Sequence, residues 1–253
     1  MSRALPLSEV PPFRQGDTSH SALSGRRFRA TAGAFSPNNV ASIADPASGK
    51  GCEAAQGPPR PMIVKAELGR EVQLLGEGWN FGEVMDGRRF VQASMWSLNG
   101  SGIGTFSPFA RDAIRGGGPM DGGDALIANQ GFVNGLWYDA NAMGSGRSKN
   151  DLMWQGDLIK AGLAGSIRSF TLLTHWGETK RLEELNGAGY VIDPGEAVNY
   201  IENHDNQTLF DINVFKLPTG MSRDERARVQ MLAAAINLFS QGIAYFHAGV
   251  DTL

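Results

Sequence analysis

The sequence predicts an α/β fold with a parallel sheet, because three consecutive segments near the C-terminal end alternate between strand and helix. The segment "AVNYIENHDNQ" is an apolar run that ends in a polar cluster, as expected of a buried strand. The segment "SRDERARVQMLAAAINLFSQG" repeats apolar residues with the period of a helix, and "IAYFHAGVD" is a second buried strand. A strand, a helix and a strand in this order form a parallel βαβ unit.

Length and composition limit the number of domains and the kinds of molecule that the protein is expected to bind. The 253 residues allow one large domain or two small ones, and the net charge of -3 predicts neither a nucleic-acid nor a membrane partner. The single cysteine, Cys52, excludes an internal disulfide bond. The first twenty residues contain no apolar core of a signal peptide, so the sequence leaves the location open, with the cytoplasm as the default.

The chain changes character near residue 65. Before it, segments such as "ADPASGKGCEAAQGPPRP" are rich in Ala, Gly and Pro and show no apolar period. Such a composition offers too little apolar surface to offset chain entropy. We therefore expect residues 1–64 to be a disordered or unrelated leader, and residues 65–253 to be the folded domain.

Four further elements follow in order along residues 65–253. We expect "EVQLL" and "SGIGTF" to be short strands, and the glycine-rich residues 115–146 to form a long loop. The segment "DLMWQGDLIKAGLAG" is expected to be a helix capped by Asn150 or Asp151.

The last helix has the clearest boundary signals. Ser222 and Glu225 have the spacing of a capping box, and Gly242 is expected to end the helix. One apolar face is expected to pack on the core, through Val229, Leu232, Ala233, Ile236 and Phe239.

Two polar groups follow predicted strands. Glu77 lies between two glycines and precedes Trp79, which fits either a solvated turn or an acid held beside an aromatic stacking face. The pair His204-Asp205 ends another strand, and it is either a structural pair or part of a site. In a (β/α) barrel the carboxyl ends of strands share one face, so both groups could reach one ligand.

Four segments occur in an order that resembles a known family. They are "GEGWN", "GIGTFS" with "RDAIRGGGP", "NYIENHDNQTLFD" and "AYFHAGVD". Together they resemble the type I pullulanases, the starch-debranching members of the α-amylase superfamily (glycoside hydrolase family 13). The resemblance covers about Lys65 to Asp251, and it implies a partial (β/α)8 TIM barrel comprising about strands 5–8.

The resemblance also implies an activity and its residues. Glu77 corresponds to the general acid/base, and Asp205 corresponds to the transition-state stabiliser. His204 and Asn206 would bind the substrate, and Trp79 would stack on a sugar. The implied reaction is retaining hydrolysis of α-1,6-glucosidic branch linkages in pullulan, starch or glycogen, with an α-glucan polysaccharide as partner and no cofactor.

The sequence departs from the family pattern at the nucleophile. The family carries it in a G-F-R-F-D motif that this sequence lacks, and Pro108-Phe109 replaces an Asp-Arg pair. We therefore expect a half barrel that is inactive alone, such as a truncated or frame-shifted product, with open sheet edges available for self-association. The alternative is a non-catalytic carbohydrate-binding or interaction remnant.

We expect the other charged residues near these segments to have structural roles. We expect Asp112 and Arg115 to form an ion pair that anchors a loop near the site. Asp121, Asp124 and Asp139 lack the D-x-D-x-D spacing of a calcium loop, so we expect a solvated loop and no metal.

Overall fold

The computed structural model describes residues 73–89, 91–144 and 146–252. All of these residues belong to one compact unit, Val40–Leu253. The expected leader, residues 1–64, and the first residues of the predicted strand "EVQLL" lie outside the described residues.

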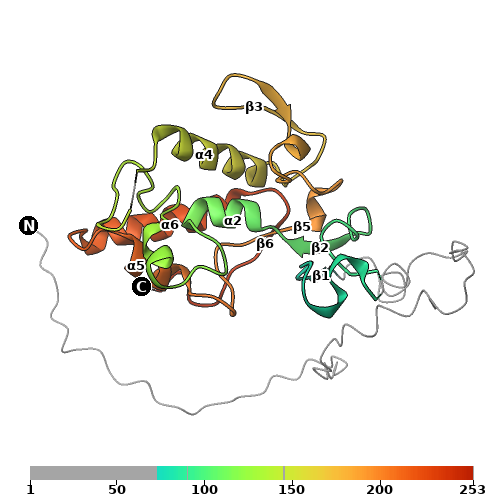
Figure 1. The fold of residues 1–253 in the computed structure, drawn as a ribbon, viewed down its shortest axis with the longest axis horizontal. Coiled ribbons are helices and arrows are strands. Elements are labelled where there is room, and N and C mark those ends of the chain that lie inside the picture. The colour runs from blue at the N-terminus through green and yellow to red at the C-terminus, as the bar shows by residue number, and fades with distance from the viewer. Residues whose placement is uncertain (1–72, 90, 145, 253) are drawn as a thin grey trace, which may run out of the picture. The chain divides into compact units, whose positions relative to one another are not determined.

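A four-stranded parallel sheet organises the described part of the chain (Figure 1). Its strands are β1 (Leu74–Gly76), β2 (Ile103–Phe106), β5 (Ala197–Asn199) and β6 (Ile243–Ala244), in the spatial order β1-β2-β5-β6. All three neighbouring pairs are parallel. The predicted α/β class is therefore confirmed, although β6 has only two residues and the predicted strand through His247 is much shorter than expected.

Helices connect these strands and cover one side of the sheet. They are α2 (Pro108–Arg115), α3 (Gly123–Ala128), α4 (Lys149–Leu163), α5 (Leu209–Lys216) and α6 (Arg223–Phe239). Short 3-10 helices form at η3 (Gly82–Gly87), η4 (Leu182–Glu184) and η5 (Pro194–Glu196). The strand β3 (Thr171–Leu173) pairs antiparallel with β4 (Thr179–Arg181). Figure 1 shows α2 following β2 and lying alongside α4, and its residues Ala113 and Ile114 join the main core.

Both predicted helix starts contain capping boxes. In α6 the Ser222 hydroxyl accepts from the Glu225 amide, and the Glu225 carboxylate accepts from the Ser222 amide, as predicted. In α4 the cap is Ser148, not Asn150 or Asp151, because Asp151 occupies the third helical position and bonds back to the Ser148 amide at 2.7 Å.

The far end of α6 differs from the prediction. The helix ends at Phe239 with Ser240 as its cap, before Gly242 is reached. Phe239 is 73% exposed and Leu232 is 46% exposed, so the predicted apolar face is not packed as one stripe. The reason is a set of buried amides: Gln230 and Asn237 occupy the inner side and donate to carbonyls of the segment after β6.

The glycine-rich residues 115–146 are not one long loop. They contain α3 and a close approach between two backbone segments, where a Cβ added to Gly116 would lie 2.2 Å from the Gly131 nitrogen. The buried Asn134 side chain accepts from the Gly131 amide and donates to the Arg115 carbonyl. Backbone contact and buried amides therefore order a segment whose composition favours a loop.

Aromatic residues gather at the carboxyl ends of β2, β5 and β6. Phe106 packs edge to face with Tyr200 and Tyr245, with ring centroids 5.0 and 5.2 Å apart. Val198 and Trp79 pack against the same cluster. Aromatic pairs of this geometry contribute about 0.5–1.5 kcal/mol each beyond area burial, so this cluster ties the strand ends together.

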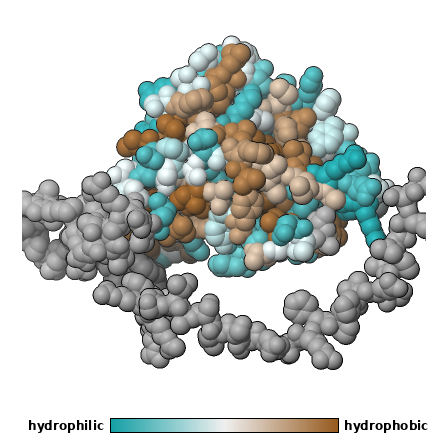
Figure 2. Space-filling view, turned by 180° about the vertical axis from the view of Figure 1, so that it is seen from behind, coloured by the Kyte–Doolittle hydropathy of each residue, from teal (hydrophilic) through white to brown (hydrophobic). Residues whose placement is uncertain are grey.

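The outer surface of the described part carries hydrophobic residues in patches, and Figure 2 shows them grouped on the face opposite to the view of Figure 1. Exposed examples on α5 and α6 are Phe210, Val214, Phe215, Met231, Leu232, Leu238 and Phe239. No helix of residues 73–252 that the structure describes is long and apolar enough to cross a membrane.

Candidate functional site

Glu77 directly follows β1, at the carboxyl end of that strand, and its side chain is exposed. The next residue, Gly78, has φ of +72°, and a Cβ there would lie 2.8 Å from the Thr105 side chain. The Gly78 carbonyl also accepts from the Met95 amide at 2.9 Å. The turn is thus held tightly against β2, while its carboxylate faces outward, and a larger residue at position 78 would disturb it.

Trp79 is half-buried next to this turn. One part of its ring packs against the clusters of Met95 and Phe106, and its carbonyl accepts from the Gln92 side chain at 2.7 Å. Trp79 therefore has a fixed position, and part of its ring remains accessible.

The segment after β5 leads from the core to the surface. Tyr200 and Asn203 are buried, whereas His204 and Asp205 are exposed. The Asn203 side-chain oxygen accepts from the His204 amide at 2.9 Å and from the Tyr245 hydroxyl at 3.1 Å. The loop that presents His204-Asp205 is therefore anchored at its start. Since β2 lies between β1 and β5, the backbones carrying Glu77 and this loop begin about 10 Å apart.

Arg115 fixes both ends of the same loop. Its guanidinium is buried and donates to the carbonyl oxygens of Ile201 and Gln207, each at 2.9 Å. Asp112 instead pairs with Arg111, at 2.5 Å, so the predicted pair between Asp112 and Arg115 is wrong. The reason is geometric: Arg115 points toward the loop, where two backbone carbonyls need donors.

Arg111 makes a second link to the loop. Its guanidinium donates to the Asn206 side-chain oxygen and lies 5.7 Å from the centre of the Tyr200 ring. Asn206, one of the residues expected to bind substrate, is therefore held by α2. Cation–π contact and a charge-assisted hydrogen bond together fix the side of the loop next to Asp205.

Burial changes the pKa values of three side chains next to this loop, those of Arg115, Tyr200 and Asp112. It lowers the pKa of Arg115 to about 10, with Arg111 adding repulsion, and raises the pKa of Tyr200 to about 12. Burial also raises the pKa of Asp112, and the two arginines oppose that change. Two buried guanidinium groups and one half-buried carboxyl group therefore lie next to the loop.

Comparison with known proteins identifies the family. No protein-family model matches the chain. The chain is 40% identical over 204 residues to a pullulanase of Klebsiella aerogenes, and 39% identical over 193 residues to the chloroplastic pullulanase 1 of Arabidopsis thaliana. These matches cover 77% and 73% of the chain. A crystal structure of PulA from Klebsiella pneumoniae in complex with maltotriose superposes with a TM-score of 0.70, at 39% identity over 75% of the chain.

The chain belongs to the pullulanase-type glycoside hydrolases. It corresponds to a partial region of them, because it spans 18% and 20% of the length of the two relatives, and 20% of the PulA chain. The resemblance stated from the four sequence segments is thereby confirmed.

The roles of two arginines that hold this loop were not predicted correctly from the sequence. Arg111 was not singled out, and Arg115 was given the wrong partner. The spacing of four residues in "RDAIR" was an available signal, because it places both arginines on one side of a helix. Nothing in the sequence indicated that the two guanidiniums meet a loop some 90 residues later.

The acidic residues of the glycine-rich segment do not form a cluster. Asp121 accepts from the Asn129 side chain at 2.8 Å, and Asp124 is exposed. Within the ranges that the structure describes, no group of three or more His, Cys, Asp or Glu side chains is placed to hold a metal ion.

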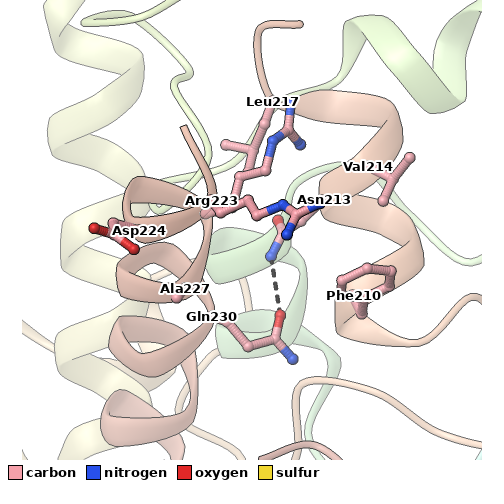
Figure 3. A pocket seen from close by; sticks show the side chains of 9 residues that line it. Phe210, Asn213, Val214, Leu217, Arg223, Asp224, Ala227 and Gln230 are labelled. Carbon is pink, nitrogen blue, oxygen red and sulfur yellow. Dashed lines mark hydrogen bonds between the residues drawn. The ribbon is translucent and has the colours of Figure 1, made fainter. Parts of the chain in front are cut away.

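A groove of about 600 Å³ lies between α5 and α6 (Figure 3). Phe210 and Val214 line it from α5, and Ala227 and Gln230 line it from α6. Asn213 donates to Gln230 across its floor at 3.4 Å. The described residues lining this groove do not include the residues expected to catalyse or to bind the glucan.

Proposed function

We propose that the chain is the part of a pullulanase-type debranching hydrolase that carries Glu77 as general acid/base and Asp205 as transition-state stabiliser. The observation that supports it best is the placement of these residues. Glu77 follows β1 and the loop bearing Asp205 follows β5, so both leave the carboxyl ends of strands in one parallel sheet.

We also propose that the sheet is about strands 5–8 of a (β/α)8 barrel. The four strands neighbour one another in sequence order and are all parallel, which is the arrangement of consecutive barrel strands. Residues 65–253 would form this half barrel, and residues 1–64 would be the leader.

The proposed chemistry assigns one task to each group. Glu77 protonates the oxygen of the leaving α-1,6-linked glucan and later takes a proton from the attacking water. Asp205 hydrogen-bonds sugar hydroxyls more strongly as the ring approaches the oxocarbenium ion. His204 and Asn206 hold the sugar at the cleaved bond, and the accessible part of Trp79 stacks on the neighbouring unit.

A retaining hydrolase also needs a nucleophilic carboxylate about 5–5.5 Å from the acid. The sequence has no G-F-R-F-D motif to supply it. We therefore propose that the chain binds α-glucan but does not complete the double displacement alone. The second candidate function, non-catalytic carbohydrate binding, uses the same exposed His204 and Asp205 side chains.

Maltotriose is a direct probe, since related PulA structures contain it. Isothermal titration calorimetry of the whole chain should detect binding. Asp205→Asn should weaken it at least about tenfold, because a hydrogen bond to a charged group contributes about 1.5–3 kcal/mol. Asp124→Asn, at an exposed site on α3, is the matched control and should bind as the parent does. Equal binding by both variants would refute the role given to Asp205.

A further inference from the structure

A second cavity lies beside the start of α5, between α6 and the segment that follows β6. Its volume is about 350 Å³, near the lower end of the range for small-molecule sites and large enough for a single sugar ring. Glu202, Thr208 and Phe210 line one side, and His247 and Thr252 line another.

The cavity is distinct from the proposed catalytic site, although the two are close in sequence. Its described lining does not include Glu77, His204 or Asp205. Phe210 and Gln230 line both this cavity and the groove of Figure 3, so the two hollows are neighbours on the same side of α5 and α6.

Glu202 is the feature of this cavity that lacks a structural explanation. Its side chain is 2% exposed, and its Oε2 accepts from the Leu209 amide at 2.5 Å. Its Oε1 is buried and has no hydrogen-bond partner in the part of the chain that the structure describes. A buried carboxylate oxygen without a donor is costly, and Glu202 lines the cavity, so a small turn of its side chain would let a molecule in the cavity supply the donor.

Arg115 does not remove this requirement. Its charge acts on Glu202, but its guanidinium hydrogen bonds go to the carbonyls of Ile201 and Gln207. The nearby positive charge offsets the charge of the carboxylate. It therefore favours a neutral hydrogen-bond donor over a second cation.

The other walls suit a sugar. Phe210 is 47% exposed and offers an apolar ring to the apolar face of a pyranose. The hydroxyls of Thr208 and Thr252 make hydrogen bonds to protein groups and retain capacity to accept one from a ligand. Carboxylate, hydroxyl and aromatic groups thus converge on one small cavity.

We propose that this cavity binds one neutral pyranose unit, such as a terminal glucosyl unit of an α-glucan. A sugar hydroxyl donates to Glu202 Oε1, and the ring packs on Phe210. A metal ion fits less well, because Glu202 and His247 are too few ligands for a divalent cation. The inference does not depend on hydrolysis, since it uses neither Glu77 nor Asp205.

The test is a titration of the whole chain with methyl α-glucoside, followed by ligand-detected NMR. We expect saturable binding that Glu202→Gln weakens at least about tenfold, since a hydrogen bond to a charged group is lost. Phe210→Ala should weaken binding as well. Phe215→Ala is the matched control: this residue is on the same helix, is 45% exposed and does not line the cavity, so binding should be unchanged.

Other results of these titrations would overturn the proposal of a sugar site at Glu202. Binding that is lost in Asp205→Asn but kept in Glu202→Gln would place the sugar at the proposed catalytic site and overturn the inference. No saturable binding, or displacement of the sugar by methylammonium chloride, would also overturn it. If Glu202→Gln fails to give a cooperative unfolding transition, the comparison of Phe210→Ala with Phe215→Ala decides alone. Failure here leaves the maltotriose result with Asp205→Asn intact, so the two proposals are separable.

Discussion

Buried Arg115 joins the two ends of the loop that presents His204 and Asp205, with hydrogen bonds of 2.9 Å to the carbonyls of Ile201 and Gln207. One side chain of α2 thereby sets the path of seven residues that follow β5. Loop position in this protein depends on a contact between segments that are far apart in the sequence.

Replacing Arg115 by Met should lower the free energy of unfolding by about 3 kcal/mol or more, because two buried carbonyls lose charged donors. Urea unfolding followed by circular dichroism measures this. The matched control is Arg226→Met, since half-buried Arg226 also donates to two carbonyls, those of Met221 and Pro218, away from the loop. An equal cost for both variants would contradict a special role for Arg115. Maltotriose binding should weaken only in Arg115→Met.

Stability should rise with pH between about pH 7 and 10 because of Lys216. This residue is 1% exposed, and burial, with repulsion from Arg115, lowers its pKa to about 7 from the usual 10.5. In this window the unfolded chain holds a proton that the folded chain has lost, so raising the pH favours folding by up to about 1.4 kcal/mol per unit. Charged groups that also act on Lys216 are Arg111, Asp112 and Asp121.

Urea unfolding at several pH values checks this slope. Lys216→Met should flatten it, whereas Lys149→Met, at an exposed position of α4, should leave it unchanged. Above about pH 10 the trend should reverse. Burial raises the pKa of Tyr190 and Tyr200 to about 12, so the folded state retains two protons there, and Arg115, whose pKa falls to about 10, offsets this by one proton. A flat profile in the parent protein would show that Lys216 keeps its proton when folded.

Gly131→Ala should destabilise the fold by at least about 2 kcal/mol, as expected of overpacking. A Cβ at this position would lie 2.2 Å from the Gly116 nitrogen and 2.6 Å from the Ile114 oxygen, which are backbone atoms that cannot rotate away. Gly118→Ala is the control, because no atom lies within 4 Å of its Cβ position. Thermal unfolding of both variants compares them, and a similar small effect would mean that the two backbones separate easily.

The purified chain should release no reducing sugar from pullulan, because Glu77 and Asp205 alone cannot form and hydrolyse a covalent intermediate. A reducing-end assay over a long incubation measures this. Turnover that disappears in Glu77→Gln would contradict the expectation, and it would mean that another carboxylate acts as nucleophile.

Among the described strands, β1 and β6 occupy the outer positions of the parallel sheet, as expected for the two open edges. Unpaired edges favour association with another chain, so light scattering after size exclusion should give a mass above that of one chain. Leu75→Lys places a charge on exposed β1 and should reduce this mass. Leu173→Lys, on exposed β3 of the separate hairpin, should not. A sharp monomer peak for the parent would refute self-association.

Local sequence signals were sufficient for the class of the fold and for several boundaries. The alternation of strand and helix predicted the parallel sheet, and the spacing of Ser222 and Glu225 predicted the start of α6. The four ordered segments also predicted the family. These features are readable because each depends on residues that are neighbours along the chain. The roles of Glu77 and Asp205 stay predictions.

Tertiary structure alone decided which residues meet across the chain. The sequence could not show that Arg115 contacts Ile201 rather than Asp112, nor that Gly116 and Gly131 bring two backbones together. It also could not show that the polar side chain of Gln230 lies on the buried side of α6, where apolar residues were expected. Propensity and periodicity describe local preferences, whereas the partner of a buried polar group is set by whichever donor or acceptor the packed chain leaves nearby.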